Sequence, residues 1–159
     1  MKTRELVVTA LLAALSLVIP LALGGYLTIT VPPFTATVAS HVPVMLAMLV
    51  SPWSAFMTGL ASALGFLIRF GTPVVAARAL MHAVFGLAGA VLIRRGSRFA
   101  TALLATWPLH ALTEALVVLP FGFTLAKAGL VVGVGTALHH LIDSVIALAV
   151  RRLVSLPRF

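Results

Sequence analysis

Three pairs of ionisable residues lie four positions apart inside long apolar runs. These pairs are Arg78/His82, His110/Glu114 and His139/Asp143. At ~3.6 residues per turn, the two members of each pair share one face of a helix. An ionisable group in the middle of a membrane span costs roughly 2.5–3.5 kcal/mol on insertion scales, so such groups normally face a protein interior and mark a site. The pairs predict one polar site built by three helices.

Three kinds of chemistry fit these pairs. Arg78 is a natural anchor for an anionic group such as a carboxylate. The histidines and acids could instead supply nitrogen and oxygen ligands for a divalent ion such as Zn²⁺, although Arg78 would then lie near the cation. In a purely structural interpretation, Arg78 pairs with Glu114 and His139 with Asp143, and each pair fixes helix packing. We favour the anion site and assign no metal ligand.

The stretch "TALHHLIDS" places two histidines side by side. Successive helical residues point about 100° apart, so His140 faces away from His139 and Asp143. We expect His139 to contact the ligand and Asp143 to orient it. His140 is expected to be an interhelical donor or an interfacial residue. His41, near the start of another apolar run, is expected to cap either the pocket or its own helix.

Catalytic motifs are missing from the sequence. It has neither Gly-x-Ser-x-Gly nor His-Glu-x-x-His, and nothing resembles a phosphate-binding loop. The absence of cysteine excludes thiolate ligands and disulfides. We therefore predict a non-enzymatic chain without a cofactor, which cannot itself hydrolyse ATP.

The composition is that of an integral membrane protein. Hydrophobic residues make up 62% and charged residues 9% of the chain, and the mean hydropathy is +1.20, whereas soluble domains are about 25% charged. Several apolar stretches approach the ~20 residues that a spanning helix needs, and the alternation of barrel strands is absent. The fold class is therefore an all-α bundle, with residues 1–159 as a single domain in the cell membrane.

Six helices are predicted, at about residues 5–23, 39–50, 53–70, 74–93, 99–119 and 129–151. The second is short for a full span and ends before Ser51-Pro52. The uncharged segment "GGYLTITVPPFTATV" is turn-rich and partly strand-like. We expect it to form a structured outer loop.

The net charge of +8 is distributed as a membrane topology signal. Six spans with both termini in the cytoplasm place most of the basic residues inside: Lys2, Arg4, Arg94, Arg95, Arg98, Arg151, Arg152 and Arg158. Only Arg69, Arg78 and Lys127 fall on or near the outer side. Because the charges flank apolar segments, we do not expect nucleic-acid binding.

Small residues recur at the spacing used where membrane helices pack closely. The pairs are Ala10/Ala14, Gly59/Ala63, Gly86/Ala90 and Gly129/Gly133. Packing inside the bundle is the default interpretation for each pair. Ala10/Ala14 is also considered as a docking site for a second membrane subunit.

Three blocks of the sequence carry a family resemblance. They are "RELVVTALLAALSLVIP", "SHVPVMLAMLVSPWSAFMTGLASALGFL" and "RALMHAVFGLAGAVLIRR". They resemble the substrate-binding S components of energy-coupling-factor (ECF) vitamin transporters, over nearly the whole chain. The resemblance implies a subunit that captures a small water-soluble vitamin outside the cell. A membrane coupling subunit and two ATP-binding subunits would complete the importer.

The resemblance also implies roles for individual residues. Ala10, Ala13 and Ala14 match the small residues that pack against the coupling subunit. The loop at 24–38 matches the segment that closes over the substrate, with these candidate contacts: Tyr26, Phe34 and Thr35. The ligand is expected near the outer surface, among these residues: Arg78, His82, His110, Glu114 and His139. The start "MKTRELV" lacks the N-terminal histidine motif of the nickel- and cobalt-specific relatives.

Among vitamins, the resemblance favours niacin, because "SHVP" and "RALMH" are most similar to niacin-type members. Arg78 would suit the carboxylate of the pyridine ring, with His82 or Glu114 near the ring nitrogen. Trp53 and Trp107 fall nearer the inner side, which argues against a large flat ligand stacked on indole rings. The alternative is a divalent metal-binding transporter or a membrane metalloenzyme that uses the His, Glu and Asp pairs.

Overall fold

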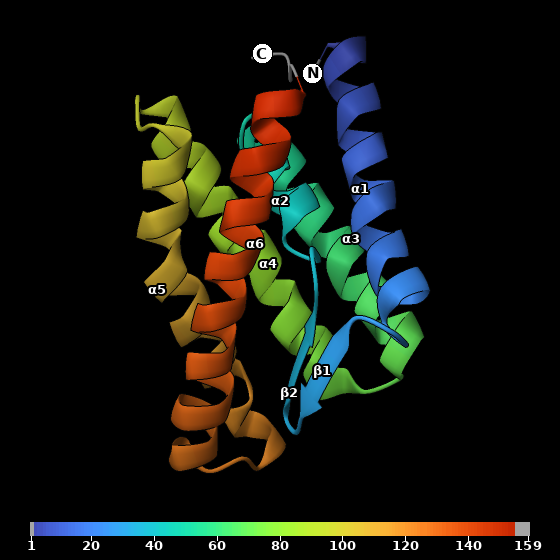
Figure 1. The fold of residues 1–159 in the computed structure, drawn as a ribbon, viewed down its shortest axis with the longest axis vertical. Helices are drawn as coiled ribbons and strands as arrows, with labels where there is room; N and C mark the ends of the chain where they lie inside the picture. The colour runs from blue at the N-terminus through green and yellow to red at the C-terminus, as the bar shows by residue number, and fades with distance from the viewer. Residues whose placement is uncertain (1, 155–159) are drawn as a thin grey trace.

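A computed structural model describes residues 2–154, which form a bundle of helices with a small β-hairpin against one side (Figure 1). In chain order the elements are α1 (Thr3–Leu23), β1 (Thr28–Val31), β2 (Phe34–Thr37), α2 (Val42–Ala47), α3 (Pro52–Phe70), α4 (Pro73–Arg94), α5 (Phe99–Val117), η1 (Leu119–Phe121), the π-helix η2 (Lys127–Gly133) and α6 (Val134–Leu153). Helix order and most boundaries follow the predictions from the sequence.

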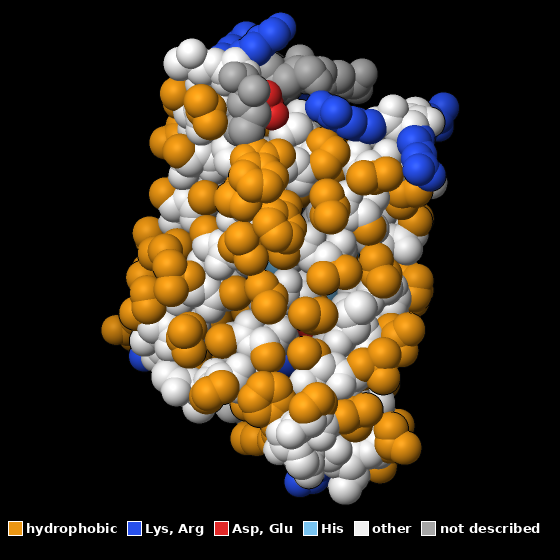
Figure 2. Space-filling model, turned by 180° about the vertical axis from the view of Figure 1, so that it is seen from behind, with side chains coloured by type: hydrophobic (Ala, Val, Ile, Leu, Met, Phe, Trp, Pro, Cys, Tyr) orange, Lys and Arg blue, Asp and Glu red, His pale blue; other side chains and the backbone are white. Residues whose placement is uncertain are grey.

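Five stretches of helix in the described chain are long and apolar enough to cross a membrane. They are α1, α3, α4, α5 with its extension to Phe121, and η2 joined to α6. Hydrophobic side chains cover the middle of the molecule, and Lys and Arg gather mainly at one end (Figure 2). The start of α1 and the end of α6 both lie at this basic end of the molecule (Figure 1). The arrangement is that of a multi-pass membrane protein.

The predicted helix at 39–50 is wrong in length, because α2 has only six residues, Val42–Ala47. Ala39 has a left-handed φ of 66°, which a right-handed helix cannot contain, so the helix begins only after this residue. Strand β2 and helix α2 together carry the chain from the hairpin back toward the end where α1 begins (Figure 1). Every residue of α2 is buried. The segment formed by β2 and α2 therefore lies in the interior of the bundle, and α2 is not a lipid-facing spanning helix.

The predicted outer loop contains an antiparallel hairpin. Thr28 pairs with Thr37 and Val31 with Phe34, and Pro32 and Pro33 form the turn. The two strands differ in exposure, because β1 is mostly exposed whereas β2 is mostly buried. Strand β2 is therefore the part of the hairpin that lies against the helices.

Glycines permit the close helix contacts of the bundle. A Cβ at Gly59 on α3 would meet the backbone of Ala83 on α4, and one at Gly86 would lie 2.6 Å from Val44 of α2. The predicted interior packing is confirmed for these two glycines. It is wrong for Ala10 and Ala14, which are exposed on α1, and for Gly129, where an added Cβ would meet no atom within 4 Å.

Gly59→Ala is expected to destabilise the protein, since the backbone of Ala83 cannot move aside for the added methyl group. Such overpacking typically costs about 1–3 kcal/mol. Gly129→Ala adds the same methyl group where no atom lies within 4 Å, and is the matched control. Thermal unfolding of the two variants in the same detergent measures the difference. Equal melting temperatures would contradict the close α3–α4 packing.

Candidate functional site

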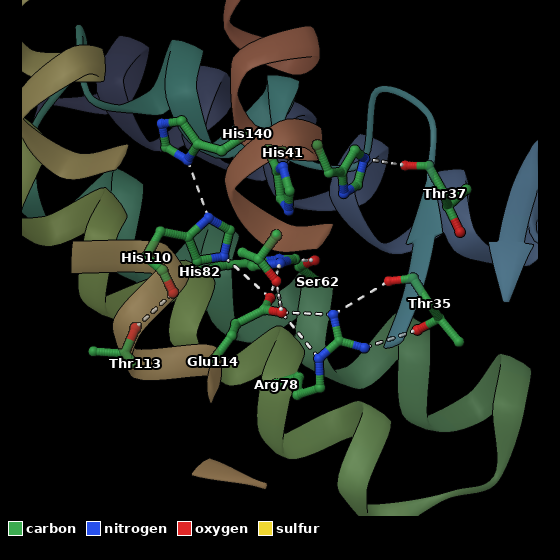
Figure 3. A network of polar contacts seen from close by, with 12 residues as sticks. Thr35, Thr37, His41, Ser62, Arg78, His82, His110, Thr113, Glu114 and His140 are labelled. Atoms are coloured by element: carbon green, nitrogen blue, oxygen red, sulfur yellow. Dashed lines mark hydrogen bonds and ion pairs between the residues drawn. The ribbon is translucent and has the colours of Figure 1, made fainter. Parts of the chain in front are cut away.

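Buried ionisable residues from several elements meet beside β2 (Figure 3). None is more than 8% exposed. They are His41 before α2, Arg78 and His82 on α4, His110 and Glu114 on α5, and His139, His140 and Asp143 on α6. The predicted convergence of the three i,i+4 pairs is therefore confirmed.

The guanidinium of Arg78 has partners on two sides (Figure 3). Nε and Nη2 donate to Oε2 of Glu114 at 2.9 and 2.6 Å. Nη1 donates to the carbonyl of Pro33 at 2.9 Å and to the hydroxyl of Thr35 at 3.3 Å, and Nη2 donates to the carbonyl of Thr35 at 3.3 Å. All five N–H groups of the arginine are thus used. The structural pairing of Arg78 with Glu114 is confirmed, and the same side chain ties the hairpin to α4 and α5.

The two oxygens of Glu114 have different surroundings. Besides Arg78, Oε2 accepts a hydrogen bond from the hydroxyl of Thr136 at 2.7 Å. Oε1 lies 3.1 Å from Nε2 of His110 and 3.6 Å from Nε2 of His82. The other nitrogen of His82, Nδ1, lies 2.7 Å from the hydroxyl of Ser62. One carboxylate oxygen therefore joins α4 to α6, and the other faces two imidazoles.

Asp143 holds the connection between β2 and α2. Its Oδ1 accepts from the backbone N–H of Ala39 at 2.9 Å, and its Oδ2 accepts from the backbone N–H of His41 at 3.0 Å. The predicted His139–Asp143 pair is present, with Nε2 of His139 3.2 Å from Oδ2. The same Nε2 lies 3.1 Å from the carbonyl of Thr37. His139 and Asp143 of α6 thus hold the segment between β2 and α2 through its backbone groups.

His140 joins the network from the far side. Its Nε2 lies 3.2 Å from the carbonyl of Leu103, and its Nδ1 lies 3.0 Å from Nδ1 of His110. The predicted interhelical contact from α6 to α5 is therefore present. His140 also belongs to the polar cluster, because α5 brings His110 to its side of α6.

A small cavity lies among these groups, with a volume of about 10 Å³. It is lined by Thr35, Ser40, His41, Phe66, Val75, Arg78, Ala79, His82, Glu114 and His139. A space of about 10–15 Å³ holds one water molecule. A ligand the size of an aromatic ring therefore requires some of the lining residues to move.

A larger apolar cavity of about 250 Å³ adjoins the first at Thr35 and Val75, which line both. Its other lining residues include Pro32 and Pro33 at the hairpin turn, Phe70 of α3, Val74 of α4 and Phe123 after η1. Arg78, which lines the small cavity, donates to the carbonyl of Pro33, which lines the larger one.

The predicted lid residues differ in placement. Thr35 lines the small cavity, and Phe34 is buried with its ring centroid 5.0 Å from the Arg78 guanidinium carbon. Tyr26 is 90% exposed and does not line the cavity. The structure thus brings Thr35 and Phe34 to the cluster, and leaves Tyr26 outside it.

Several partners in the cluster were not predicted. Thr136 could have been found from its position one turn before His140 on the same helix. Ser62 and the Pro33 carbonyl had no signal in the sequence, because a lone serine in a span and a backbone oxygen in a loop carry no pattern.

A bundle of membrane-length helices around a buried polar site, closed by a hairpin, defines a membrane protein of the substrate-binding or transport class. No family model matches the chain, and no solved structure matches it. The chain is 33% identical to the niacin transporter NiaX of Lactococcus lactis subsp. cremoris, over 97% of this chain and 76% of the relative. This chain belongs to that transporter's family, the substrate-binding S components of ECF transporters. A transport function agrees with the prediction that the chain is not an enzyme.

Asp143→Asn is expected to loosen the connection before α2. The asparagine side chain has one oxygen that accepts and one NH₂ group that only donates, so its two ends cannot both accept from backbone N–H groups. Leaving one buried N–H unpaired costs about 1–3 kcal/mol. Hydrogen exchange should become faster at the amides of Ala39 and His41, and the melting temperature should fall. Ser144→Ala is the neighbouring control, since the Ser144 hydroxyl has only a 4.0 Å contact with Met45 sulfur. Unchanged exchange at both Ala39 and His41 would refute this role of Asp143.

Proposed function

We propose that the chain is the niacin-binding S component of an ECF importer. The observation that carries this proposal is the 33% identity, over 97% of the chain, to a niacin transporter. The chain would capture the vitamin outside the cell. A membrane coupling subunit and two ATP-binding subunits would then drive its release inside.

The proposed topology has six crossings with both termini in the cytoplasm. Its support is the shared end at which α1 begins and α6 ends, together with the Lys and Arg side chains gathered there (Figures 1 and 2). Strand β2 and helix α2 would take the place of one spanning helix. Arg158 lies outside the described residues. The hairpin would then face the outside, as a lid over the site must.

In the proposed binding mode, the vitamin enters when β2 moves away from Arg78. The hydrogen bond from Nε of Arg78 to Glu114 remains, while the hydrogen bonds from the Nη groups to Pro33 and Thr35 are broken. The donors released on the Nη side then bind the carboxylate of niacin, as a guanidinium fork does well. When β2 returns, Thr35 and Phe34 cover the ligand.

The pyridine ring would lie against the apolar wall of the small cavity, which Phe66 and Val75 line. The ring nitrogen is an acceptor, so it needs a donor. His82 or His139 can supply one, whereas the Glu114 carboxylate, which accepts from Arg78 and Thr136, has no hydrogen to donate. We assign this donor to His139, whose Nε2 faces the carbonyl of Thr37 while β2 is in place, and we assign Glu114 to positioning Arg78. Neither a role for His41 nor one for His110 in direct contact is needed for this pose.

The proposed coupling surface is the exposed face of α1. Ala10 and Ala14 are exposed and Ala13 is half-buried, and large apolar neighbours such as Leu11, 66% exposed, flank them. Small residues allow another helix to approach closely in lipid. This surface would bind the coupling subunit, which in turn recruits the ATP-binding subunits.

The purified protein is expected to bind niacin, and to bind nicotinamide more weakly because the amide lacks the charge that pairs with Arg78. Arg78→Lys should weaken niacin binding by about 100-fold, or about 2.8 kcal/mol, because lysine keeps the charge but lacks the guanidinium fork. Arg69→Ala, at an exposed arginine, should bind normally. Isothermal titration in detergent measures the binding of niacin and nicotinamide by the wild type, and of niacin by each variant. A folded wild-type protein that does not bind niacin would refute the proposal.

Ala14→Trp is expected to abolish copurification with the coupling and ATP-binding subunits, because the indole would hold the two helices apart. Niacin binding by the isolated chain should be unchanged. Leu104→Trp places the same side chain at a 61% exposed position on α5 and is the control. If Ala14→Trp still assembles like the control, the coupling subunit docks elsewhere.

A further inference from the structure

Four buried side chains from three parts of the fold converge on one point beside the cavity. Each of the residues His41, His82, His110 and Glu114 offers an atom that can bind a metal, and these atoms all lie within 4.8 Å of one another. None of the four residues is more than 2% exposed. Ligand atoms around a tetrahedral Zn²⁺ lie about 3.3–3.6 Å apart, given bond lengths of about 2.0–2.2 Å. Small side-chain rotations would therefore bring the four atoms to bonding distance.

The hydrogen-bond directions leave two acceptors facing each other. A carbonyl oxygen only accepts, so Nε2 of His140 donates to Leu103, and Nδ1 of a neutral His140 must accept. Nδ1 of His110 therefore donates to His140, and Nε2 of a neutral His110 carries a lone pair. This lone pair lies 3.1 Å from Oε1 of the Glu114 carboxylate, which also only accepts. A positive ion between the two atoms is what this arrangement requires.

The remaining contacts match those of metal-binding side chains. A histidine that binds a metal almost always gives its other ring N–H to a fixed partner. His110 has His140 as that partner, and His82 has the hydroxyl of Ser62, 2.7 Å from its Nδ1. Nε2 of His82 is thereby left to face Oε1 of Glu114 at 3.6 Å.

His41 offers the fourth ligand atom of the set, one of its two ring nitrogens. Its Nδ1 is fully buried without a hydrogen-bond partner among the described residues. It lies 3.2 Å from Oδ2 of Asp143, but not in hydrogen-bond geometry. A second possible set, of His41, His139 and Asp143, is less suitable. His139 already faces the carbonyl of Thr37, and both oxygens of Asp143 already accept backbone N–H groups.

We propose that His41, His82, His110 and Glu114 bind a divalent transition-metal ion, and that this ion is zinc. Three imidazole nitrogens and one carboxylate oxygen are ligands that zinc accepts in tetrahedral geometry. Arg78 does not compete for the ion, because its bonds go to Oε2 of Glu114 while Oε1 faces the histidines. The ion is a resident of the site and not the transported cargo.

The ion would also explain how the site takes an anion, a step that rests on the proposed function. With neutral histidines, Arg78 contributes +1 and Glu114 and Asp143 contribute −1 each, so the cluster without the ion has a charge of −1. A divalent ion changes this charge to +1, which matches one carboxylate. Niacin binding should therefore require the metal.

Metal binding can be tested on the protein without any vitamin. The protein is purified in detergent, stripped with a chelator and titrated with Co²⁺ and Zn²⁺. We expect one equivalent of either ion, the intense visible absorption of tetrahedral Co²⁺, and loss of that absorption when Zn²⁺ is added. His82→Gln and His110→Gln should each weaken Zn²⁺ binding more than the roughly 10–100-fold typical of losing an outer hydrogen-bond partner.

His139→Gln is the matched control, because it changes a buried histidine of the same cluster outside the proposed set, and it should bind Zn²⁺ like the wild type. A wild-type protein that binds no stoichiometric ion would overturn the metal site and leave a proton on His110 as the positive charge. Loss of binding in His139→Gln, with binding retained in His110→Gln, would also overturn it. Unfolding temperatures of the variants show that each is folded.

Niacin titration of the stripped and Zn²⁺-loaded wild type separates the two proposals. Niacin binding only to the loaded protein supports both. Niacin binding that is equal in the two forms overturns the requirement for the metal while the proposed function stands. Stoichiometric Zn²⁺ without niacin binding overturns the proposed function and leaves the metal site in place.

Discussion

The interior of this protein depends on the buried carboxylate of Glu114. In a bilayer no water reaches an unpaired polar group, so each charge inside the bundle must find its partners within the protein. Glu114 on α5 receives Arg78 from α4 and Thr136 from α6, and its second oxygen faces His110 and His82. One side chain thereby fixes the relative positions of three helices. Removing either member of such a buried pair leaves an uncompensated charge, which is why the pair acts as a unit.

The same principle fastens the hairpin. Arg78 extends from Glu114 to the backbone of β2 at Pro33 and Thr35, and Asp143 holds the backbone just after β2 at Ala39 and His41. The two attachments lie at opposite ends of β2. Movement of β2 therefore breaks charge-assisted hydrogen bonds at one end or the other. A ligand that supplies replacement partners for Arg78 lowers that cost, which would couple ligand capture to lid closure in the proposed function.

The outside of the bundle follows from the lipid. Exposed leucines and valines cover the helices between the charged ends (Figure 2), and the polar side chains are inside, since lipid offers them no partner. On α1, Ala10 and Ala14 lie on the exposed side. Small residues on a lipid-facing surface have no packing role in the isolated chain. They are free to let another helix approach.

Local patterns determined which helices form and which polar residues share a helix face, because hydropathy and helical periodicity act between residues a few positions apart. They were sufficient for the pairing of His110 with Glu114 and of His139 with Asp143. Contacts between distant segments decided the rest. The length of α2, the contact of His140 with His110 and the use of the Pro33 carbonyl by Arg78 depend on helices that meet only after folding. No local pattern describes which carbonyl or ring nitrogen a buried charge will find, since that is set by packing. The chain alone thus specified the set of polar groups, and the tertiary structure decided that Nε2 of His110 and Oε1 of Glu114 face each other at 3.1 Å.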